Sequence, residues 1–264
     1  MEKKRKRKQR QVVARGVGEN AKDPFPSHSR PTREECETLR DTLLAIHGIP
    51  PDLAKYRQAQ PSPEPVLDGL VRTVLSQNTT EPNSLRAFAS LKSSFPTWEH
   101  VLAADSNDVQ NAIRCGGLAP TKASCIQNVL RSLRERRGHL CLEYLRQMSV
   151  DQVKAELSLF KGIGPKTVAC VLMFNLQQDD FPVDTHIFEI AKTIGWVPAV
   201  ADRNKSYLHL NQRIPNELKF DLNCLLYTHG KLCRKCSGKK DVGVTQIKFM
   251  NQMSILLKIS QDEC

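Results

Sequence analysis

Two side chains with chemical potential, Lys166 and Asp184, stand eighteen positions apart in the sequence. Lys166 lies in "LFKGIGPKTVAC" (residues 159–170), where glycines and a proline precede a run with helical spacing. A cation in the first turn of a helix opposes the helix dipole and forfeits about 0.3–1 kcal/mol, and the same field disfavours the ammonium form. Lys166 is therefore either an amine that could attack an electrophilic sugar carbon and form a Schiff base, or an exposed lysine that holds a phosphate.

Asp184 stands in "FPVDTHIF" (residues 181–188), directly before an amphipathic run that begins at Ile187. An aspartate at this position is expected to cap the helix by accepting hydrogen bonds from free backbone N–H groups. The same carboxylate could also face Lys166. It would then support proton transfer and stabilise the positive charge that develops on a deoxyribose as a base departs.

A tight turn between two helices is predicted directly before Lys166. Gly162 and Gly164 permit the positive backbone angles that such a hairpin demands, and Pro165 fits the first helical position, which needs no N–H group. The turn presents unpaired backbone N–H groups at a helix start, an anion site that a DNA phosphate would complete. An ordinary glycine-capped turn is the alternative.

The chain as a whole is basic. Its 264 residues contain 39 Lys and Arg against 28 Asp and Glu, and the formal net charge of +11 makes nucleic acid the first candidate partner. No stretch approaches the roughly 18 uninterrupted apolar residues that a membrane helix needs, so we expect no membrane partner. Nine cysteines without a secretory signal indicate reduced thiols rather than a disulfide framework.

The N-terminal region is polar, and seven of its first ten residues are Lys or Arg. We expect residues 1–33 to form a disordered arm. The basic run resembles a nuclear localisation signal or a non-specific DNA-binding arm, and the expected location is therefore the nucleus.

Helices should position the candidate residues. From about Val66 onward the apolar residues recur at spacings of three and four, and no run shows sustained alternation, so the sequence predicts an all-α fold. Ser106, Thr121 and Ser149 each precede a helical pattern and are predicted N-caps. A proline-rich stretch at 50–65 separates an earlier helix from the rest of the chain.

The string "LFKGIGPKTVACVLMF" followed by "FPVDTHIF" resembles the helix-hairpin-helix and Gly/Pro-Asp signature (HhH-GPD) of the endonuclease III superfamily of DNA glycosylases. "VLSQNTT" and "GGLAPTKASCI" occur in the order that the family has them, and the resemblance runs from about Val66 to about Cys236. The longer string "FPVDTHIFEIAKTIGWVP" is also similar to the DEMETER-type 5-methylcytosine glycosylases of plants. The resemblance implies two helical lobes with a DNA-binding cleft between them, a catalytic lysine at Lys166 and a catalytic aspartate at Asp184.

The composition of the chain and this resemblance together imply how the chain is divided. The expected parts are a disordered basic arm (1–33), a helix and linker that join the second lobe (34–63), the helical bundle with the hairpin (64–184), the C-terminal helices of the second lobe (185–236) and an atypical tail (237–264).

The resemblance also implies contacts with double-stranded DNA, bound by a monomer. Gly162, Gly164 and Thr167 are the expected contacts in the hairpin. In "SQNTT" the family places a polar side chain that fills the gap left by an extruded nucleotide, and here it is Gln77 or Asn78, with ungapped matching slightly in favour of Asn78. Extrusion is needed because the glycosidic carbon is inaccessible in a stacked duplex.

Many family members carry a four-cysteine loop, C-x6-C-x2-C-x5-C, that holds a 4Fe-4S iron–sulfur cluster after an "HG" dipeptide. Here the dipeptide precedes Cys233 and Cys236, and the next cysteine is Cys264. Four thiolates at the conventional spacing are absent, so we expect no cluster and name no certain cofactor. The tail after Cys236 does not resemble the family, and we expect it to be an alternative or truncated C-terminus that replaces the cluster loop.

The sequence thus predicts a bifunctional DNA glycosylase and AP lyase of base-excision repair, which removes an oxidised pyrimidine such as thymine glycol through a Schiff base on Lys166. 5-Methylcytosine, removed by the same chemistry, is the alternative substrate. A non-catalytic helix-hairpin-helix module that binds DNA is the alternative from another class, and binding alone would not require both Lys166 and Asp184. No GxSxG, HExxH or Walker-type sequence points to another hydrolase.

Overall fold

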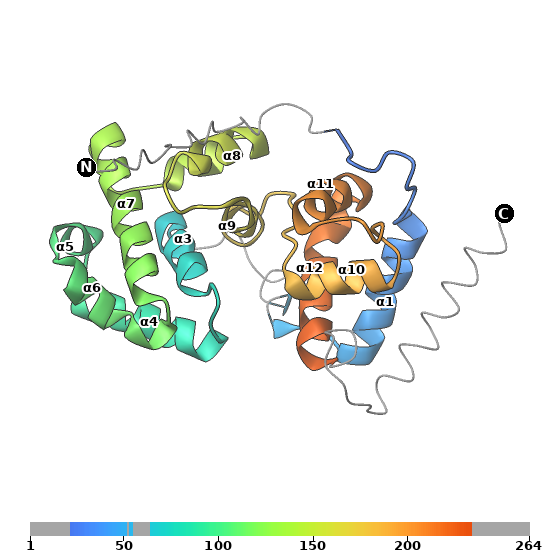
Figure 1. Ribbon diagram of the computed structural model, residues 1–264, viewed down its shortest axis with the longest axis horizontal. Helices are drawn as coiled ribbons and strands as arrows, with labels where there is room; N and C mark the ends of the chain where they lie inside the picture. Colours follow the sequence, from blue (N-terminus) through green and yellow to red (C-terminus); the bar gives the residue numbers. More distant parts are fainter. Residues whose placement is uncertain (1–21, 52, 55–63, 234–264) are drawn as a thin grey trace, which may run out of the picture.

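The computed structural model describes residues 22–51, 53–54 and 64–233, and within these ranges it is helical and has no strands, which confirms the predicted all-α fold. No helix in those ranges is long and apolar enough to cross a membrane. Figure 1 shows two helical lobes, one with α3 to α8 and the other with α1 and α10 to α12, with α9 between them. The α-helices are α1 (Arg33–His47), α3 (Val66–Leu75), α4 (Glu81–Ser94), α5 (Trp98–Ala103), α6 (Ser106–Ala112), α7 (Ala119–Arg137), α8 (Val150–Ser158), α9 (Pro165–Cys170), α10 (Thr185–Thr193), α11 (Arg203–Arg213) and α12 (Asn216–Leu232). Two 3-10 helices, η1 (Arg114–Gly116) and η2 (Glu143–Gln147), and one π-helical turn, η3 (Val171–Asn175), complete the described elements.

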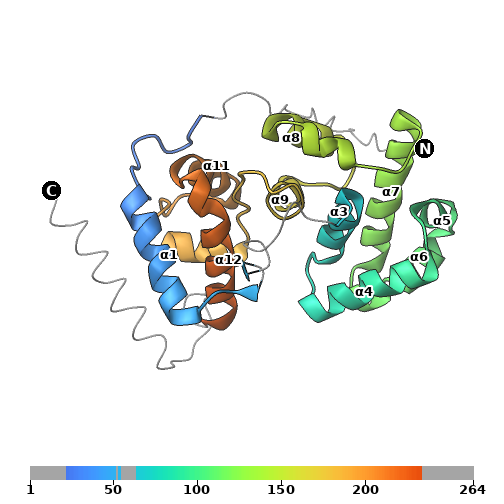
Figure 2. The same ribbon diagram turned by 180° about the vertical axis from the view of Figure 1, so that it is seen from behind.

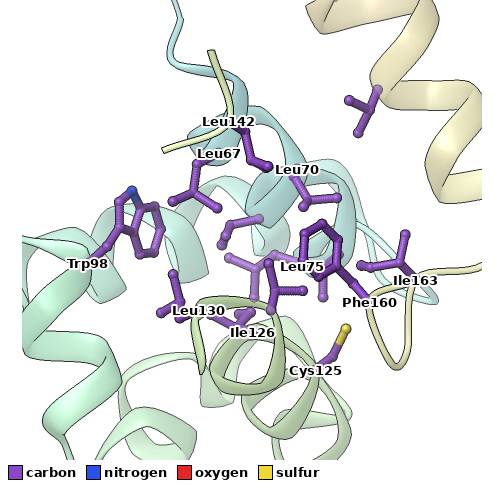
Figure 3. Close-up of a cluster of buried hydrophobic side chains, with 14 of the residues drawn as sticks. Leu67, Leu70, Leu75, Trp98, Cys125, Ile126, Leu130, Leu142, Phe160 and Ile163 are labelled. Carbon is purple, nitrogen blue, oxygen red and sulfur yellow. The ribbon is translucent and has the colours of Figure 1, made fainter. Parts of the chain in front are cut away.

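The first lobe is a bundle around α3 and α7. Seven of the ten residues of α3 are buried, because apolar residues lie around most of the circumference of the helix and not along a single stripe. Figure 3 shows Leu70 and Leu75 of α3 in one cluster with Ile126 and Leu130 of α7. This core is built from a single continuous stretch of the chain, residues 66–172.

Two side chains anchor the hairpin between α8 and α9 in this core. Phe160 and Ile163 are buried in the bundle, beside Cys125 of α7 (Figure 3). Gly162 has a φ of 97°, and a Cβ there would lie 2.8 Å from the Cys125 sulfur, so the position needs glycine for both its backbone and its space. Gly164 has a φ of −96° and open space around it, so the expected positive angle is present at Gly162 and not at Gly164.

The second lobe is assembled from segments that are distant in sequence (Figure 2). α12 packs against both α1 and α10, and buried leucines of α1 and α12 share one core. Met173, Phe181 and Val183 also belong to this core. The chain therefore changes cores after Leu172, ahead of the predicted boundary at residue 184, because the π-helical turn and the loop after it carry apolar side chains into the second lobe.

Residues 22–32, for which the sequence predicts disorder, lie against α11. His209 is fully buried, with Nδ1 2.7 Å from an Asp23 carboxylate oxygen and Nε2 2.7 Å from the Arg30 carbonyl oxygen. Arg213 donates to the other oxygen of Asp23 at 3.2 Å. The prediction of disorder is wrong for this segment because its polar groups find partners far along the chain. Residues 1–21, with the basic run, lie outside the described residues.

The predicted helix starts are partly correct. Ser149 caps α8 in a reciprocal capping box, as its position before the apolar run indicates. Asp105, and not Ser106, caps α6, because its carboxylate accepts the nearest free backbone N–H group. α7 begins two residues before Thr121, and Pro120 occupies its first turn, where no N–H group is needed.

Candidate active site

A cavity of about 430 Å³ lies between the two lobes. Its wall is formed mainly by residues of α3, α4, α9, η3, α12 and the start of α10. Lys166 and Asp184 both line it, so the fold brings together the two residues that the sequence singles out. In Figures 1 and 2, α9 lies between the two lobes, and Lys166 is a residue of this helix.

Lys166 is exposed in the first turn of α9, directly after Pro165. The N-cap residue is Gly164, and no side chain caps the helix, so the N–H groups of its first turn have no side-chain acceptor. α9 passes directly into the π-helical turn, and the two together form a longer helical segment. The cation therefore stands at the positive end of a helix dipole, as the sequence predicts.

Asp184 has the local role that its sequence position predicts. It is the N-cap of α10, and its Oδ1 accepts a hydrogen bond from the Ile187 backbone N–H at 2.8 Å. Its side chain is half-buried and also lines the cavity. The capping bond fixes the carboxylate at the cavity wall and leaves lone pairs on its oxygens for a ligand.

Cys170 is a cavity residue that the sequence did not distinguish from a structural buried thiol. It lies one helical turn after Lys166 and lines the same cavity. Burial raises the pKa of the Cys170 thiol to about 11. The positive charge of Lys166 opposes this rise, whereas the carboxylates of Asp184 and Asp180 add to it. The cavity therefore presents a neutral thiol beside an amine and a carboxylate.

The structure separates the roles of Gln77 and Asn78. The Gln77 side-chain amide donates to the Thr167 hydroxyl at 3.0 Å and joins the end of α3 to the start of α9. Asn78 is exposed, and its φ of 49° places it in the left-handed region. Thr167 is buried and its hydroxyl accepts the hydrogen bond from Gln77, so its predicted contact with DNA stays a prediction. Periodicity could not reveal this, because the contact joins two helices 90 residues apart.

Leu118 is an exposed apolar residue that the sequence did not single out. It is 52% exposed and has a φ of 50° at the N-cap of α7. The buried Lys122 holds this region, because its ammonium donates to the carbonyl oxygens of Leu75 at 2.7 Å and Gly116 at 2.8 Å. These bonds join the end of α3, three residues before Asn78, to the glycine turn directly before Leu118. The signal in the sequence was "GGL", two glycines before a large apolar residue.

The cysteines in the described part of the chain do not form a four-cysteine group. Cys233 follows the end of α12, and Cys236 lies outside the described residues. Cys224 is buried inside α12 and lines the cavity instead. Within the described ranges, no group of three or more His, Cys, Asp and Glu side chains could hold a metal ion.

The "HG" dipeptide has a packing role in the second lobe. His229 is buried, and its Nδ1 lies 2.9 Å from the Nε2 of His47 on α1. A Cβ at Gly230 would overlap the His186 side chain of α10, so glycine lets the two helices approach. The dipeptide therefore joins three helices of the lobe through its own contacts.

Comparison with known proteins assigns the chain to a family. The family model for the HhH-GPD superfamily of base excision DNA repair proteins matches residues 71–216. A candidate DNA glycosylase of Arabidopsis thaliana is 59% identical over 249 residues, covering 86% of this chain and 84% of that protein. The chain belongs to the HhH-GPD superfamily of DNA glycosylases in base-excision repair, as its resemblance to endonuclease III predicts.

More distant relatives agree with this family. Endonuclease III of Sulfolobus acidocaldarius is 28% identical over 175 residues, covering 66% of this chain and 75% of that protein. The DNA glycosylase/AP lyase ROS1 of Arabidopsis thaliana is 36% identical over 118 residues, which are 45% of this chain and 8% of ROS1. In fold, the chain matches an endonuclease III–DNA complex with a TM-score of 0.63 at 19% identity, covering 79% of this chain and 90% of that one.

Proposed function

We propose that this protein is a bifunctional DNA glycosylase and AP lyase that removes an oxidised pyrimidine from double-stranded DNA. The observation that carries the proposal is the presence of Lys166 and Asp184 in one interlobe cavity of about 430 Å³, a size that admits an extruded nucleotide. A module that only binds DNA needs neither residue in a cavity. The paired amine and carboxylate therefore favour an enzyme.

The chemistry follows from the two side chains. The lone pair of the Lys166 amine forms a bond to C1′ of the nucleotide, while the bond from C1′ to the base breaks and the base leaves with the electron pair. Asp184 stabilises the positive charge that develops on the sugar and accepts the proton released from the amine. Opening of the sugar ring gives a Schiff base on Lys166. Loss of a proton from C2′ then expels the 3′ phosphate and cuts the strand.

DNA binding is assigned to the face that carries the hairpin. The first-turn N–H groups of α9 and the open space around Gly164 suit a backbone phosphate. Asn78 replaces the extruded nucleotide in the duplex, because Gln77 is already engaged with Thr167. Leu118 is an apolar wedge that can enter the base stack and help to keep the nucleotide extruded.

The substrate has a second candidate, 5-methylcytosine, which the local similarity to ROS1 favours. We further propose that the protein acts as a monomer in the nucleus. The net charge of +11 and the basic run in residues 1–10 support this location and the DNA partner.

Borohydride trapping on duplex DNA tests the proposed function. The protein and its Lys166→Gln variant are compared on duplexes that contain thymine glycol, 5-methylcytosine or an abasic site. We expect a covalent complex on the abasic site and on one base substrate, absent in the variant. Lys161→Gln, which removes an exposed lysine five positions away, is the matched control and should trap as the native protein does at excess enzyme.

The outcomes separate the candidates. Trapping on 5-methylcytosine and not on thymine glycol would replace the substrate and keep the mechanism. Binding of duplex DNA without trapping on any of the three substrates would contradict the enzymatic proposal in favour of the binding module. Trapping that persists in Lys166→Gln would assign the nucleophile to another amine.

A further inference from the structure

A second polar group in the cavity wall takes no part in the chemistry of Lys166. It consists of Asn175, Glu64 and Arg72, and all three line the cavity. Asn175 ends the π-helical turn and is 5% exposed, yet its side chain faces this space. π-helical turns occur frequently at functional sites, because the extra residue in the turn redirects the side chains that follow.

The orientation of the Asn175 amide is fixed. Its Nδ2 donates to Glu64 Oε2 at 3.4 Å, and Arg72 donates to the other oxygen of Glu64 at 3.0 Å. An ionised carboxylate only accepts hydrogen bonds, so the amide nitrogen must face Glu64 and the amide oxygen must face away from it. An asparagine amide has two flip states that exchange its nitrogen and oxygen, and the contact with Glu64 selects one of them.

The backbone around this group is held as well. One terminal nitrogen of the Arg146 guanidinium donates to the backbone carbonyl oxygen of Asn175 at 3.0 Å. The other terminal nitrogen donates to the backbone carbonyl oxygen of Glu64 at 2.9 Å. Both residues that approach the ligand space are thus joined to one guanidinium. A recognition group that is positioned by its neighbours loses little conformational freedom when it binds.

Gly69 provides the space for this amide. It lies in the middle of α3, where a glycine costs about 1 kcal/mol relative to alanine. A Cβ at Gly69 would overlap the amide group of Asn175. The glycine is therefore a positioning residue, because only its missing side chain lets Asn175 lie against α3.

We propose that Asn175, together with Glu64, reads the edge of the extruded base and selects a thymine-type pyrimidine with a hydroxyl group at C5. The proposal rests on the function proposed above. The wall offers an acceptor, a donor and an acceptor in order: the amide oxygen, the second N–H of the amide nitrogen, whose first N–H is bonded to Glu64, and the carboxylate of Glu64. The matching edge is donor, acceptor, donor, which a 5-hydroxylated thymine-type ring presents as N3–H, O4 and the C5 hydroxyl.

A cytosine-type ring fits this wall less well. On the same edge, 5-methylcytosine presents N3, the 4-amino group and the C5 methyl group, which are an acceptor, a donor and an apolar group. The amide oxygen of Asn175 would then face the acceptor N3, and the amide N–H would face the amino donor. Two acceptors that face each other in a cavity form no hydrogen bond, although both have lost their hydrogen bonds to water.

The experiment compares two rates of the full chain under single turnover: excision of thymine glycol from duplex DNA, and strand cleavage at an abasic site, which contains no base. In Asn175→Ala and Gly69→Ala we expect the ratio of excision to cleavage to fall roughly tenfold or more, as for loss of a bidentate contact to a base. Glu64→Gln should reduce the preference for thymine glycol over 5,6-dihydrothymine, which lacks the hydroxyl groups. Asn211→Ala, which removes an amide that bonds only within the second lobe in the described structure, is the control and should keep the native ratio.

Each outcome decides one point. A native ratio in Asn175→Ala would overturn the inference, and so would a parallel fall of both rates, since that is the result of a purely structural role. A native protein that cleaves the abasic site but excises 5-methylcytosine faster than thymine glycol would overturn the inference and leave the lysine chemistry standing. A native protein that does not cleave the abasic site would contradict the proposed function and this inference together.

Discussion

The two lobes are stabilised in different ways. The first lobe is one continuous stretch of chain around an apolar core, and its hairpin is anchored by buried side chains such as Phe160. The second lobe joins α1 to helices that follow more than 130 positions later, and polar pairs such as Asp23 with the buried His209 cross these distances. Close-packed apolar contacts do not depend on pH, whereas buried titratable pairs do.

This difference separates two tasks. The first lobe carries the hairpin and the two turns assigned to DNA, and its apolar core holds them rigidly. The second lobe supplies Asp184 and one wall of the cavity. The active site therefore depends on a lobe whose apolar core is supplemented by charges and hydrogen bonds between segments distant in sequence, and the following variants test each side of the comparison.

The largest expected effect lies in the apolar lobe. Phe160→Ala should lower the free energy of unfolding by about 3–5 kcal/mol, because the side chain is 1% exposed and its removal leaves a cavity. Leu159→Ala is the matched control, since the neighbouring side chain is 59% exposed and its loss should change stability by less than about 0.5 kcal/mol. Urea denaturation followed by circular dichroism measures both. Equal effects would show that the hairpin is not anchored by Phe160.

The junction of the lobes should be the next most sensitive place. Asp180 is fully buried, and one of its oxygens is 2.9 Å from both the Lys154 ammonium and the Tyr207 hydroxyl. Asp180→Asn should cost about 2–3 kcal/mol, because hydrogen bonds to a charged group are lost. Asp179→Asn changes the exposed neighbour and should be nearly neutral in the same urea titration. A neutral Asp180→Asn would mean that the buried charge contributes nothing to the junction.

The pair of His47 and His229 should make the second lobe sensitive to acid. Burial, and then His47, lower the pKa of His229 to about 4, and burial also lowers the pKa of His47. Both rings are then neutral in the folded state, while an unfolded histidine has a pKa near 6.5. The two neutral rings therefore contribute to the free energy of unfolding above pH 6.5. This contribution is lost as the pH falls toward 4, and the loss is roughly 1–2 kcal/mol at pH 5.

Unfolding measured between pH 7 and pH 5 tests this prediction. A His47→Leu/His229→Leu double variant should lose less stability over this range than the native protein. His100→Gln, which removes an exposed histidine of the first lobe, should keep the native slope. Equal slopes in the native protein and the double variant would remove the histidine pair from the account of acid sensitivity.

The smallest effect is expected from an ion pair on the surface between the lobes. Lys231 of α12 lies 2.9 Å from Glu81 of α4, but the two side chains are 41% and 62% exposed. A double-mutant cycle with Lys231→Gln and Glu81→Gln should give a coupling energy below about 1 kcal/mol, and less at high salt. A coupling of several kcal/mol would mean that the ion pair controls how the lobes are held together.

Much of the site could be read from local sequence. The role of Asp184 as an N-cap, the anchored hairpin at Gly162 and the place of Lys166 in a first helical turn depend on neighbours within a few positions. The family resemblance rested on the same local strings, and the family model confirms it. Local patterns succeed here because capping, turn geometry and helical periodicity are properties of short segments.

Other features required the folded chain. Polarity and prolines predicted disorder for residues 22–32, whereas Asp23 and Arg30 bind a buried histidine of α11. Gln77 and Asn78 are adjacent and similar in sequence, yet only the structure shows that Gln77 is held by Thr167. These contacts join residues distant in sequence, so no local sequence pattern predicts them.

The sequence by itself therefore determined the all-helical class, the family and the pair of residues proposed for the chemistry. Tertiary structure alone decided which side chains share a cavity with that pair. In the sequence, Cys170 and Asn175 look like ordinary residues of a helix. In the structure, a π-helical turn and a glycine on another helix place Asn175 at the cavity wall. The physical reason is that a helix fixes the angular spacing of its own side chains, whereas the packing of other helices determines which of its faces borders a cavity.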